Sequence, residues 1–491
     1  MCSRREKLET FHHPIKLSLI LSNIKPKHVN FIIPLILCSF VSISLIFYFY
    51  FSVPHKIEGN YSVHRKPLIT DEEKTNITHI LFGIGGSVNS WKDRQHYSEL
   101  WWKPNVTRGY VWLDQKPDPN MTWPETLPPY RVSEDTSRFK YSCLNGPRSA
   151  VRIARIVKES FELGLEKVRW FVLGDDDTVY FTENLVAVLA RYDHNQMYYI
   201  GGISESVDQN VGHSYNMAYG GGGFAISYPL ASELVKILDG CINRYDQFYG
   251  SDIRIQACLS EIGVPLTKEP GFHQFDIRGS PLGLLAAHPL APLVSLHHLD
   301  YVQSIFPNHT RVDSVKKLIR VSKVDPGRTL QHNFGYDLRR NWSISVSWGY
   351  TVQLYPKLVA AKTLETALQT FQTWSSSMGP FTFDTRSIML QPCERPIMYL
   401  LDQVERVGED ETVTTYKRYK SGVEINCVNC GCRPALEIEI FKVSAPKLNP
   451  ELWDKAPRRQ CVEVINGTEG VDNVIQVQIR GCNRLESVTP P

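Results

Sequence analysis

Residues 169–181 read RWFVLGDDDTVYF, and this stretch most constrains how the chain folds. The apolar run at 168–173 is bounded by Gly174, a pattern typical of a buried central strand. The carboxylates that follow it are Asp175, Asp176 and Asp177. They lie where an open α/β sheet keeps its ligand site, and their oxygens suit Mg²⁺ or Mn²⁺ shared with a substrate phosphate. The pattern alone also allows a solvated acidic turn or a Ca²⁺ loop.

Residues 31–53 form an uncharged apolar run that is long enough to span a bilayer. Lys and Arg outnumber acidic residues before this run, and no small-residue cleavage site follows it. We therefore expect a type II signal anchor, with residues 1–30 as a cytosolic tail, 54–77 as a lumenal stem, and the rest of the chain in the lumen. The net charge of +3 comes from the basic tail, so we expect no nucleic-acid partner.

The sequons and cysteines fit an oxidising lumenal compartment. The Asn-x-Ser/Thr sequons all follow the apolar run, at Asn60, Asn76, Asn105, Asn120, Asn308, Asn341 and Asn466. Most of the cysteines beyond residue 53 should form disulfides, and at least one should be left over. Cys427, Cys430 and Cys432 resemble half of a zinc site, but no second pair lies nearby, so disulfides are favoured.

Strands and helices are expected to alternate from residue 78 to residue 310, which predicts an α/β fold with a parallel-type sheet. Expected strands lie at 78–84, 108–114, 168–173 and 197–202, and expected helices at 149–163, 182–192, 229–238 and 252–262. After residue 311 the pattern changes. Runs that alternate in the manner of strands predict a separate, mostly β, cysteine-containing domain at 311–491, with a helix near 360–373.

Three further features are candidates for a site, and each has a structural explanation as well. The glycine run 220–223 leaves room for a close approach of backbone or ligand, or it marks a bulge. Asp252 follows Ser251 at the start of a helix, where both are good capping residues. His297 or His298, beside Asp300, could complete a divalent metal site, although a buried or surface histidine is the commoner case.

Taken in order, RWFVLGDDDTVYF, GGGGFAIS, GSDIRIQACL, GVPLTKEPGFH and VSLHHLD resemble the fringe-like (β-1,3-glycosyltransferase-like) family. The likeness is greatest to its plant branch, which adds a carboxyl-terminal domain of unknown role, and it covers about residues 78–310. The resemblance implies a Rossmann-like nucleotide-sugar transferase fold of the GT-A type. It also implies a Golgi location and Mn²⁺, with Mg²⁺ possible, bound between the aspartate triplet and the diphosphate of a UDP-sugar.

The same resemblance assigns roles by position. Asp175, Asp176 and Asp177 match the metal-binding triplet, with Asp177 as the direct ligand, and His297 matches the histidine that completes the metal shell; His298 is its neighbour. Asp252 matches the catalytic base. The donor-binding matches are Gly221, Gly222 and Gly223, and, more weakly, Arg94 and Trp101. Two departures concern the acceptor side: Ser251 stands where the family commonly has another carboxylate, and FHQFD replaces a two-histidine turn.

The activity that the resemblance implies is inverting transfer of a hexose or N-acetylhexosamine from a UDP-sugar to a hydroxyl of a glycan or glycoprotein. The expected product linkage is β-1,3. Asp252 would need a raised pKa, since a helix amino terminus favours the ionised form. Asp276 and Glu269 are the alternative bases, and Cys241–Cys258 is a plausible disulfide. The alternatives are an inactive lumenal sugar-binding or scaffold protein and a Ca²⁺-stabilised adhesion protein, for which Thr178, Tyr180 and Thr182 are poor ligands.

Overall fold

The computed structural model describes residues 73–375, 384–389, 391, 394–420, 432–449, 452, 457–465 and 473–489. The expected membrane span at 31–53, the cytosolic tail and most of the stem lie outside these ranges, as do Cys427 and Cys430. Within them, no helix combines the length and apolar character needed to cross a bilayer. Cys432, the third cysteine of that motif, lies within the described ranges and is disulfide-bonded.

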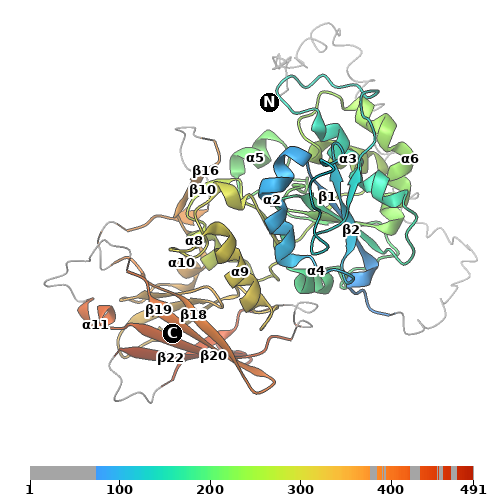
Figure 1. Cartoon of the computed structure of the whole chain (residues 1–491). Coiled ribbons are helices and arrows are strands. Elements are labelled where there is room, and N and C mark those ends of the chain that lie inside the picture. The colour runs from blue at the N-terminus through green and yellow to red at the C-terminus, as the bar shows by residue number, and fades with distance from the viewer. Residues whose placement is uncertain are drawn as a thin grey trace, which may run out of the picture. The chain divides into compact units, whose positions relative to one another are not determined.

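A seven-stranded sheet forms the centre of the amino-terminal half (Figure 1). Its strands, in spatial order, are β3 (Tyr130–Val132), β2 (Arg108–Leu113), β1 (Ile80–Gly85), β4 (Trp170–Asp175), β7 (Phe224–Ser227), β6 (Tyr199–Gly201) and β8 (Leu266–Lys268). The sheet is mixed rather than parallel, because β7 runs antiparallel to both β4 and β6. Because β6 and β7 are antiparallel neighbours, the segment that joins them leaves and re-enters the sheet at the same end of the strands and makes no crossover. The start of β7 therefore meets the carboxyl end of β4.

Helices cover both faces of this sheet, and the apolar run of β4 is buried for that reason. Alternate residues of a strand point to opposite faces, so Trp170 and Val172 join one core while Phe171 and Leu173 join another. The first core is covered by α2 (Val88–Trp101) and α4 (Thr182–Leu189), and the second by α3 (Ser149–Phe161), α6 (Tyr228–Arg244) and α7 (Asp252–Ile262). The predicted disulfide Cys241–Cys258 is present and joins α6 to α7.

Two small sheets stand beside the carboxyl end of β4. The first has the order β5 (Val179–Tyr180), β11 (Ser295–His297) and β9 (Phe272–Gln274). The second pairs β10 (Ile277–Gly279) with β16 (Phe371–Thr373). The remaining short elements are η2 (Ile77–His79), α5 (Val207–Gly212), α8 (Leu282–Ala286), η3 (Leu299–Tyr301), α9 (Arg311–Ser322), α10 (Ala361–Glu365), β15 (Ala367–Leu368), β17 (Thr385–Arg386) and α11 (Arg433–Leu436).

The carboxyl-terminal half contains a closed barrel, in agreement with the strand-like runs of its sequence. Its strands are β12 (His332–Asp337), β13 (Trp342–Ser347), β14 (Thr351–Tyr355), β18 (Ile397–Val407), β19 (Glu411–Arg418), β20 (Ile440–Pro446), β22 (Val474–Arg480) and β21 (Cys461–Val464). Cys461 and Cys482 form a disulfide at one end. The helix expected near 360–373 is confined to α10, because residues 367–368 and 371–373 pair as strands with β17 and β10.

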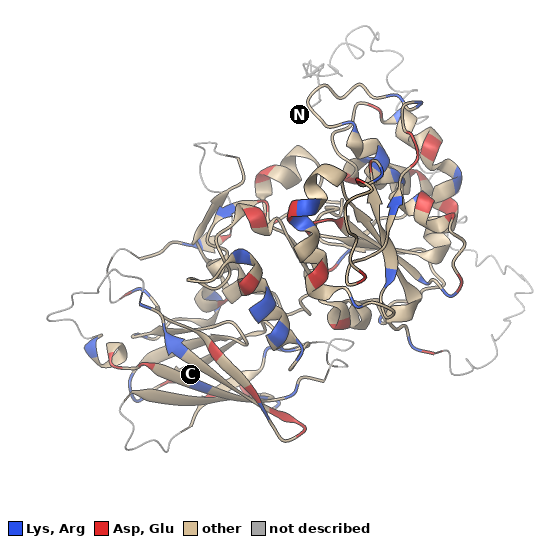
Figure 2. Ribbon diagram, in the orientation of Figure 1, with Lys and Arg blue, Asp and Glu red and all other residues tan. Residues whose placement is uncertain are grey.

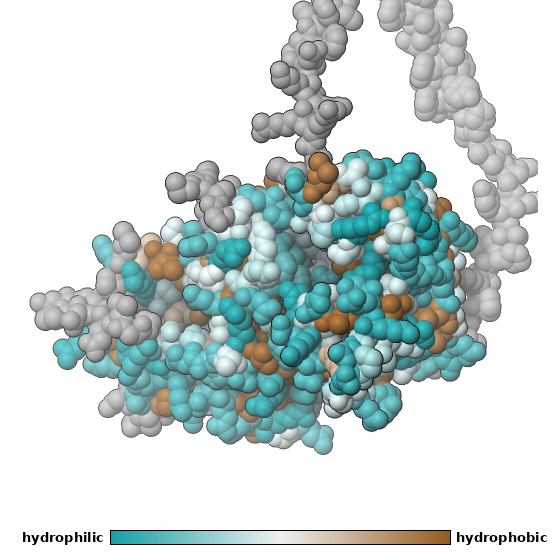
Figure 3. All heavy atoms as spheres, turned by 45° about the horizontal axis from the view of Figure 1, so that its top comes forward, coloured by the Kyte–Doolittle hydropathy of each residue, from teal (hydrophilic) through white to brown (hydrophobic). Residues whose placement is uncertain are grey.

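The first apolar core continues from the sheet into the barrel. It includes Trp91 of α2, Leu185 of α4, Leu318 of α9 and Val346 of β13, all fully buried. Charged residues of both signs are mixed over both halves (Figure 2), and the face drawn in Figure 3 is mostly hydrophilic, with apolar residues in small separate groups. Three consecutive carboxylates, at 175–177, lie at the end of β4.

Candidate metal and catalytic site

The chain turns sharply at the end of β4, so that Asp176 and Asp177 stay beside Asp175. The Asp175 backbone N–H donates to Thr178 Oγ1 at 2.8 Å, and the Thr178 N–H donates back to the Asp175 carbonyl at 3.0 Å. The Thr178 hydroxyl also donates to the carbonyl of Gly221 at 2.7 Å. These bonds tie the aspartate triplet to the glycine run that precedes β7.

Asp176 is engaged by α2 through both of its oxygens. Ser90 Oγ donates to Asp176 Oδ2 at 2.7 Å, and Arg94 Nη1 donates to Asp176 Oδ1 at 2.9 Å. The same Arg94 nitrogen lies 3.4 Å from Asp177 Oδ1. Burial raises the pKa of Asp176, while Ser90 and Arg94 oppose the rise. Asp176 therefore holds α2 against the triplet, and Arg94, expected on the donor side, contacts the triplet directly.

Two adjacent histidines face Asp177 from the end of β11. His297 Nε2 lies 3.0 Å from Asp177 Oδ1 and 3.7 Å from Asp175 Oδ2. Asp177, His297 and His298 each present a ligand atom, and these atoms all lie within 4.8 Å of one another. His298 reaches the group because its backbone leaves the strand with φ of 60° in the left-handed region, which non-glycine residues seldom adopt.

The residues of this group fit a divalent cation. Asp177 Oδ2 is buried and makes no hydrogen bond, which is costly for a carboxylate oxygen unless a cation satisfies it. His297 Nδ1 lies 3.0 Å from Gln274 Oε1, and His298 Nδ1 lies 2.8 Å from Asp276 Oδ1. These acceptors hold both rings through Nδ1, the arrangement that metal-binding histidines usually have. Nε2 is then the nitrogen that would bind a metal, and in His297 it faces Asp177 Oδ1. One carboxylate and two imidazoles suit Mn²⁺ or another transition metal better than Ca²⁺.

The charges within the group are strongly coupled. Burial alone would lower the pKa of His297, but Asp177 raises it to about 9. Burial would likewise raise the pKa of Asp177, yet His297 and Arg94 hold it well below its usual range. Burial raises the pKa of Asp175 to about 7, although His297 opposes the rise. The protein thus pairs an imidazolium with Asp177, in the place where a cation would sit.

Asp252, the first residue of α7, approaches the triplet from the other side of the glycine run. Its carboxylate accepts hydrogen bonds from Ser251 Oγ at 2.8 Å and from the backbone N–H of Gly220. Burial raises its pKa despite these bonds, which is the direction that a general base requires. A Cβ atom on Gly220 would lie 2.6 Å from Asp252 Oδ1, and one on Gly221 would lie 2.0 Å from His297 Cε1. The glycines therefore make room for site side chains.

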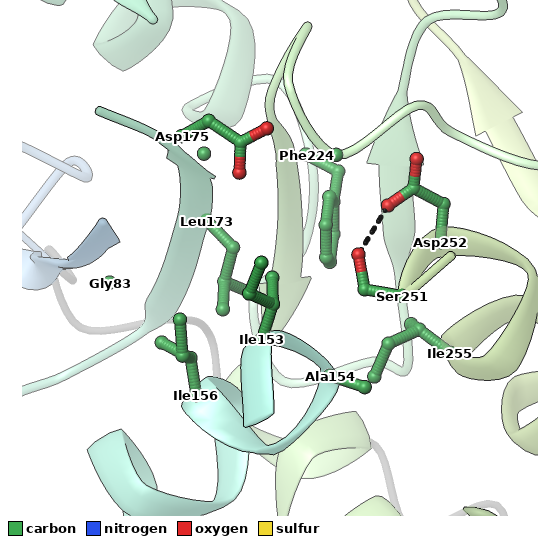
Figure 4. Close-up of a pocket in the computed structure, with 12 residues that line it drawn as sticks. Gly83, Ile153, Ala154, Ile156, Leu173, Asp175, Phe224, Ser251, Asp252 and Ile255 are labelled. Atoms are coloured by element: carbon green, nitrogen blue, oxygen red, sulfur yellow. Dashed lines mark hydrogen bonds between the residues drawn. The ribbon is translucent and has the colours of Figure 1, made fainter. Parts of the chain in front are cut away.

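One pocket contains both Asp175 and Asp252 in its lining. Figure 4 shows the two carboxylates on opposite sides of its polar end, with apolar side chains of α3 and α7 and of the strands below them. The lining residues include Ile153, Leu173 and Ile255. The empty space between these residues is about 290 Å³ with the adjoining open solvent included, so the pocket is a shallow part of a site rather than the whole of it.

Other residues that the sequence predicted for the site stabilise the backbone around it. Gly222 accepts a hydrogen bond from Ser295 through its carbonyl, and Gly223 has a left-handed φ of 85°. Trp101 is buried, and its indole N–H donates to the Thr178 carbonyl at 3.1 Å, so it supports the turn from within the core. Glu269, an alternative base, pairs with Arg191 at 2.7 Å and is 6% exposed.

Sequence reasoning did not anticipate the residues that orient the histidines. Gln274 and Asp276 come from FHQFD, the turn that departs from the resemblance. Parallel pairing places Gln274 opposite His297, and Asp276, the other alternative base, is buried and bonded to His298, Ser204 and Gln274. The only signal in the sequence was a pair of polar residues, at 274 and 276, on either side of Phe275.

Two similar proteins are both described as "Beta-1,3-glucosyltransferase". The protein from Mus musculus is 31% identical over 141 residues, which is 28% of this chain and 27% of the relative. The protein from Homo sapiens is 30% identical over 110 residues, which is 22% of this chain and 21% of the relative. The likeness thus spans only about a quarter of the length of these relatives.

A family model covers more of the chain. It matches residues 209–462, more than half of the sequence, and includes Asp252, both histidines and most of the barrel. The chain therefore belongs to the family described as "Protein of unknown function, DUF604".

Proposed function

We propose that this chain is a metal-dependent glycosyltransferase that moves a hexose or N-acetylhexosamine from a UDP-sugar to an acceptor hydroxyl, with inversion and through a β-1,3 linkage. The acceptor is a glycan or a glycoprotein, and the fold is the GT-A type in the plant branch of fringe-like enzymes. The relatives described as β-1,3-glucosyltransferases support this class of reaction.

The observation that carries the proposal is the joint placement of the metal group and Asp252. Asp177 with its unpartnered buried oxygen, His297 and His298 lie on one side of the glycine run, and Asp252 lies on the other. Asp175 links the two, because it lies 3.7 Å from His297 and shares a pocket with Asp252. A cation site next to a carboxylate of raised pKa is what transfer from a diphosphate donor needs.

In this reaction Asp177, His297 and His298 would hold the metal. A bound divalent ion would bind the donor diphosphate and offset the charge that develops on the departing UDP. Asp252 accepts the proton of the acceptor hydroxyl, whose oxygen forms a bond to the anomeric carbon as the bond to the diphosphate breaks. Attack opposite the leaving group inverts that carbon. Arg94 adds a fixed positive charge beside Asp176 and Asp177.

A donor panel tests the proposal. Purified full-length protein is incubated with Mn²⁺ and each of several UDP-hexoses and UDP-N-acetylhexosamines, and release of UDP is measured with and without candidate acceptors. We expect release with one donor, and its loss on removal of metal by a chelator. If no donor is hydrolysed or transferred while sugars still bind, the chain is the sugar-binding protein considered above and the proposal is wrong.

We propose further that the chain is a type II protein of the Golgi membrane with residues 54–491 in the lumen. The uncharged run at 31–53 supports this topology, and so do the sequon residues Asn105, Asn120, Asn308 and Asn341, which are all exposed. The test is glycosidase treatment of the protein expressed in eukaryotic cells. We expect a fall in apparent mass, and a smaller fall when these four residues are replaced by Gln, because three other sequons remain. No fall in mass in the unaltered protein would contradict the lumenal assignment.

A further inference from the structure

One strand of the carboxyl-terminal half of the chain lies next to the metal group. Strand β16 pairs antiparallel with β10, with Thr373 opposite Ile277 and Phe371 opposite Gly279. This pairing brings Trp374, the residue after β16, to the turn that carries His298. The two residues are far apart in the sequence, so this contact is a product of the fold.

The ring of Trp374 lies flat on the imidazole of His298. Their centroids are 4.9 Å apart and the planes differ by 4°. His297 stacks on His298 with a centroid distance of 3.9 Å, Tyr301 meets its edge at 5.1 Å, and Asp276 holds its Nδ1. The His298 ring is therefore fixed by contacts with three neighbouring rings and by a hydrogen bond, with Nε2 as the nitrogen left for a metal.

Trp374 is itself held in place by the amino-terminal half. Arg278 Nε donates to the Trp374 carbonyl at 3.1 Å, and the Arg278 guanidinium carbon lies 5.0 Å from the centre of the indole ring. Ser375 Oγ donates to Asp208 Oδ2 of α5 at 3.3 Å. Tyr301 also packs on the Trp374 ring at 4.9 Å. A half-buried tryptophan held this firmly is suited to position another side chain.

We infer that Trp374 is a positioning residue of the metal group, which orients His298 so that its imidazole binds the cation. The carboxyl-terminal half then takes part in building the site, through a segment that lies between the barrel strands β14 and β18 in the sequence. The inference rests on the proposed function, because both require a cation at Asp177, His297 and His298. The role of Trp374 is tested by measuring metal binding and not turnover.

The test compares Trp374→Leu, which removes the ring, with Trp374→Phe, which keeps an aromatic surface. Mn²⁺ affinity is measured by calorimetry on the full-length protein, and the visible spectrum of bound Co²⁺ reports the ligand set. We expect Trp374→Leu to weaken Mn²⁺ binding by about 10–100-fold, as loss of an orienting partner usually does, and to change the Co²⁺ spectrum. Trp374→Phe should restore most of the affinity and the wild-type spectrum.

The control is Tyr228→Leu, which removes an exposed aromatic ring that stacks on Phe171 of the second core. It should leave Mn²⁺ affinity unchanged. If Trp374→Leu does not fold, Trp374→Gln replaces it, because a half-buried position tolerates a polar side chain. Wild-type affinity and spectrum in the ring-deleted variant would overturn the inference, and so would equal losses in Trp374→Phe and Trp374→Leu.

The two proposals fail in different ways. If the wild-type protein binds Mn²⁺ and the Trp374 variants behave as expected, but no UDP-sugar is turned over, the proposed function is wrong and the role of Trp374 stands. If sugar transfer is observed and Trp374→Leu keeps both its Mn²⁺ affinity and its KM, the role of Trp374 is wrong and the function stands. Absence of Mn²⁺ binding by the wild-type protein overturns the inference.

Discussion

Asp252 shows how burial and a helix amino terminus compete for one carboxylate. The helix dipole, Ser251 and the Gly220 N–H all favour the ionised form, yet burial prevails and raises the pKa of Asp252. An ionised carboxylate with a raised pKa is a stronger base than an ordinary aspartate. Burial and the local contacts therefore act in opposite directions on this carboxylate, and the net result is a raised pKa.

We expect Asp252→Asn to lower the rate of sugar transfer by about 10²–10⁴-fold, because the amide cannot accept the proton. Binding of UDP and Mn²⁺ should persist, since the change preserves the shape of the side chain. Steady-state kinetics and calorimetry measure the two effects. Asp193→Asn, at an exposed position away from the site, is the control. A variant at position 252 with near wild-type turnover would make the assignment of the base wrong.

Gly221→Ala should disrupt the metal group without straining the backbone. The new Cβ would lie 2.0 Å from His297 Cε1, so the imidazole must move, while the φ of Gly221 is not in the left-handed region. We expect a fall in Mn²⁺ affinity of about 10–100-fold, by analogy with the loss of orienting contacts. Gly212→Ala is the control, because nothing lies within 4 Å of its added Cβ. Unchanged Mn²⁺ binding in Gly221→Ala would exclude His297 as a ligand.

At the scale of single elements, helix α3 carries a buried carboxyl whose ionisation affects stability. Burial raises the pKa of Glu159 to about 7, with Arg155 opposing, and Glu159 Oε2 is buried without a partner. Because the folded pKa exceeds the unfolded value of 4.5, the folded state holds the proton more tightly. The stabilisation is fully present below about pH 4.5 and is lost as the pH rises to about 7.

Glu159→Gln should remove this pH dependence. The amide keeps an oxygen for Arg155 and carries no charge, so the variant should gain stability relative to wild type by up to about 3 kcal/mol between pH 5 and pH 8. Urea unfolding at the two pH values measures the difference. Glu162→Gln, an exposed position at the end of the same helix, should show no such trend. An equal pH dependence in wild type and Glu159→Gln would show that Glu159 is ionised in the folded state.

The disulfide between α6 and α7 supports the helix that begins with Asp252. It closes a loop of 17 residues, for which restriction of the unfolded chain predicts about 3 kcal/mol of stabilisation. Replacing both Cys241 and Cys258 with Ala should lower the free energy of unfolding by about that amount and reduce activity. The matched double variant of Cys461 and Cys482, at the barrel, should cost similar stability and leave the rate unchanged. An equal loss of rate in both would contradict this local role.

The strand and helix patterns of the sequence predicted the elements that position the site. The apolar run ending at Gly174 is β4, the helix expected at 149–163 is α3, and the disulfide Cys241–Cys258 is present. The antiparallel course of β7 was not predicted, because periodicity shows that a strand exists and not which way it runs. The helix expected at 360–373 was mostly wrong, since residues 371–373 pair with β10, a long-range contact that local propensity cannot reveal.

The same limit applies to the site. The acidic triplet, the glycine run and the two histidines could be recognised from the sequence because consecutive carboxylates, consecutive glycines and paired histidines are seldom needed for packing alone. The residues that orient them, such as Gln274, Asp276 and Trp374, are recognised only once the strands are paired. Sequence alone therefore indicates the groups that would carry the chemistry and omits those that hold them in place.

For the whole molecule, a continuous apolar core predicts that the two halves unfold together. Leu185 of α4, Leu318 of α9 and Val346 of β13 belong to one cluster. We expect a single cooperative transition in calorimetry, with equal calorimetric and van't Hoff enthalpies. Hydrogen exchange should give the same free energy of opening for the amides of β1 and of β13. A plateau in which one half has lost protection while the other keeps it would contradict this expectation.

The left-handed backbone of His298 has a consequence for insertions and deletions. In a regular strand, neighbouring side chains point to opposite faces, so two adjacent histidines could not serve one cation. The positive φ at 298 turns the second histidine toward the first, and the chain supplies two of the three candidate ligands from consecutive positions. One residue inserted between them would move the second histidine about 3 Å further along the chain. It would then lie away from Asp276 and Trp374, which hold His298 in place, although β11 would still form. At this turn, the number of residues is therefore constrained as tightly as their identity.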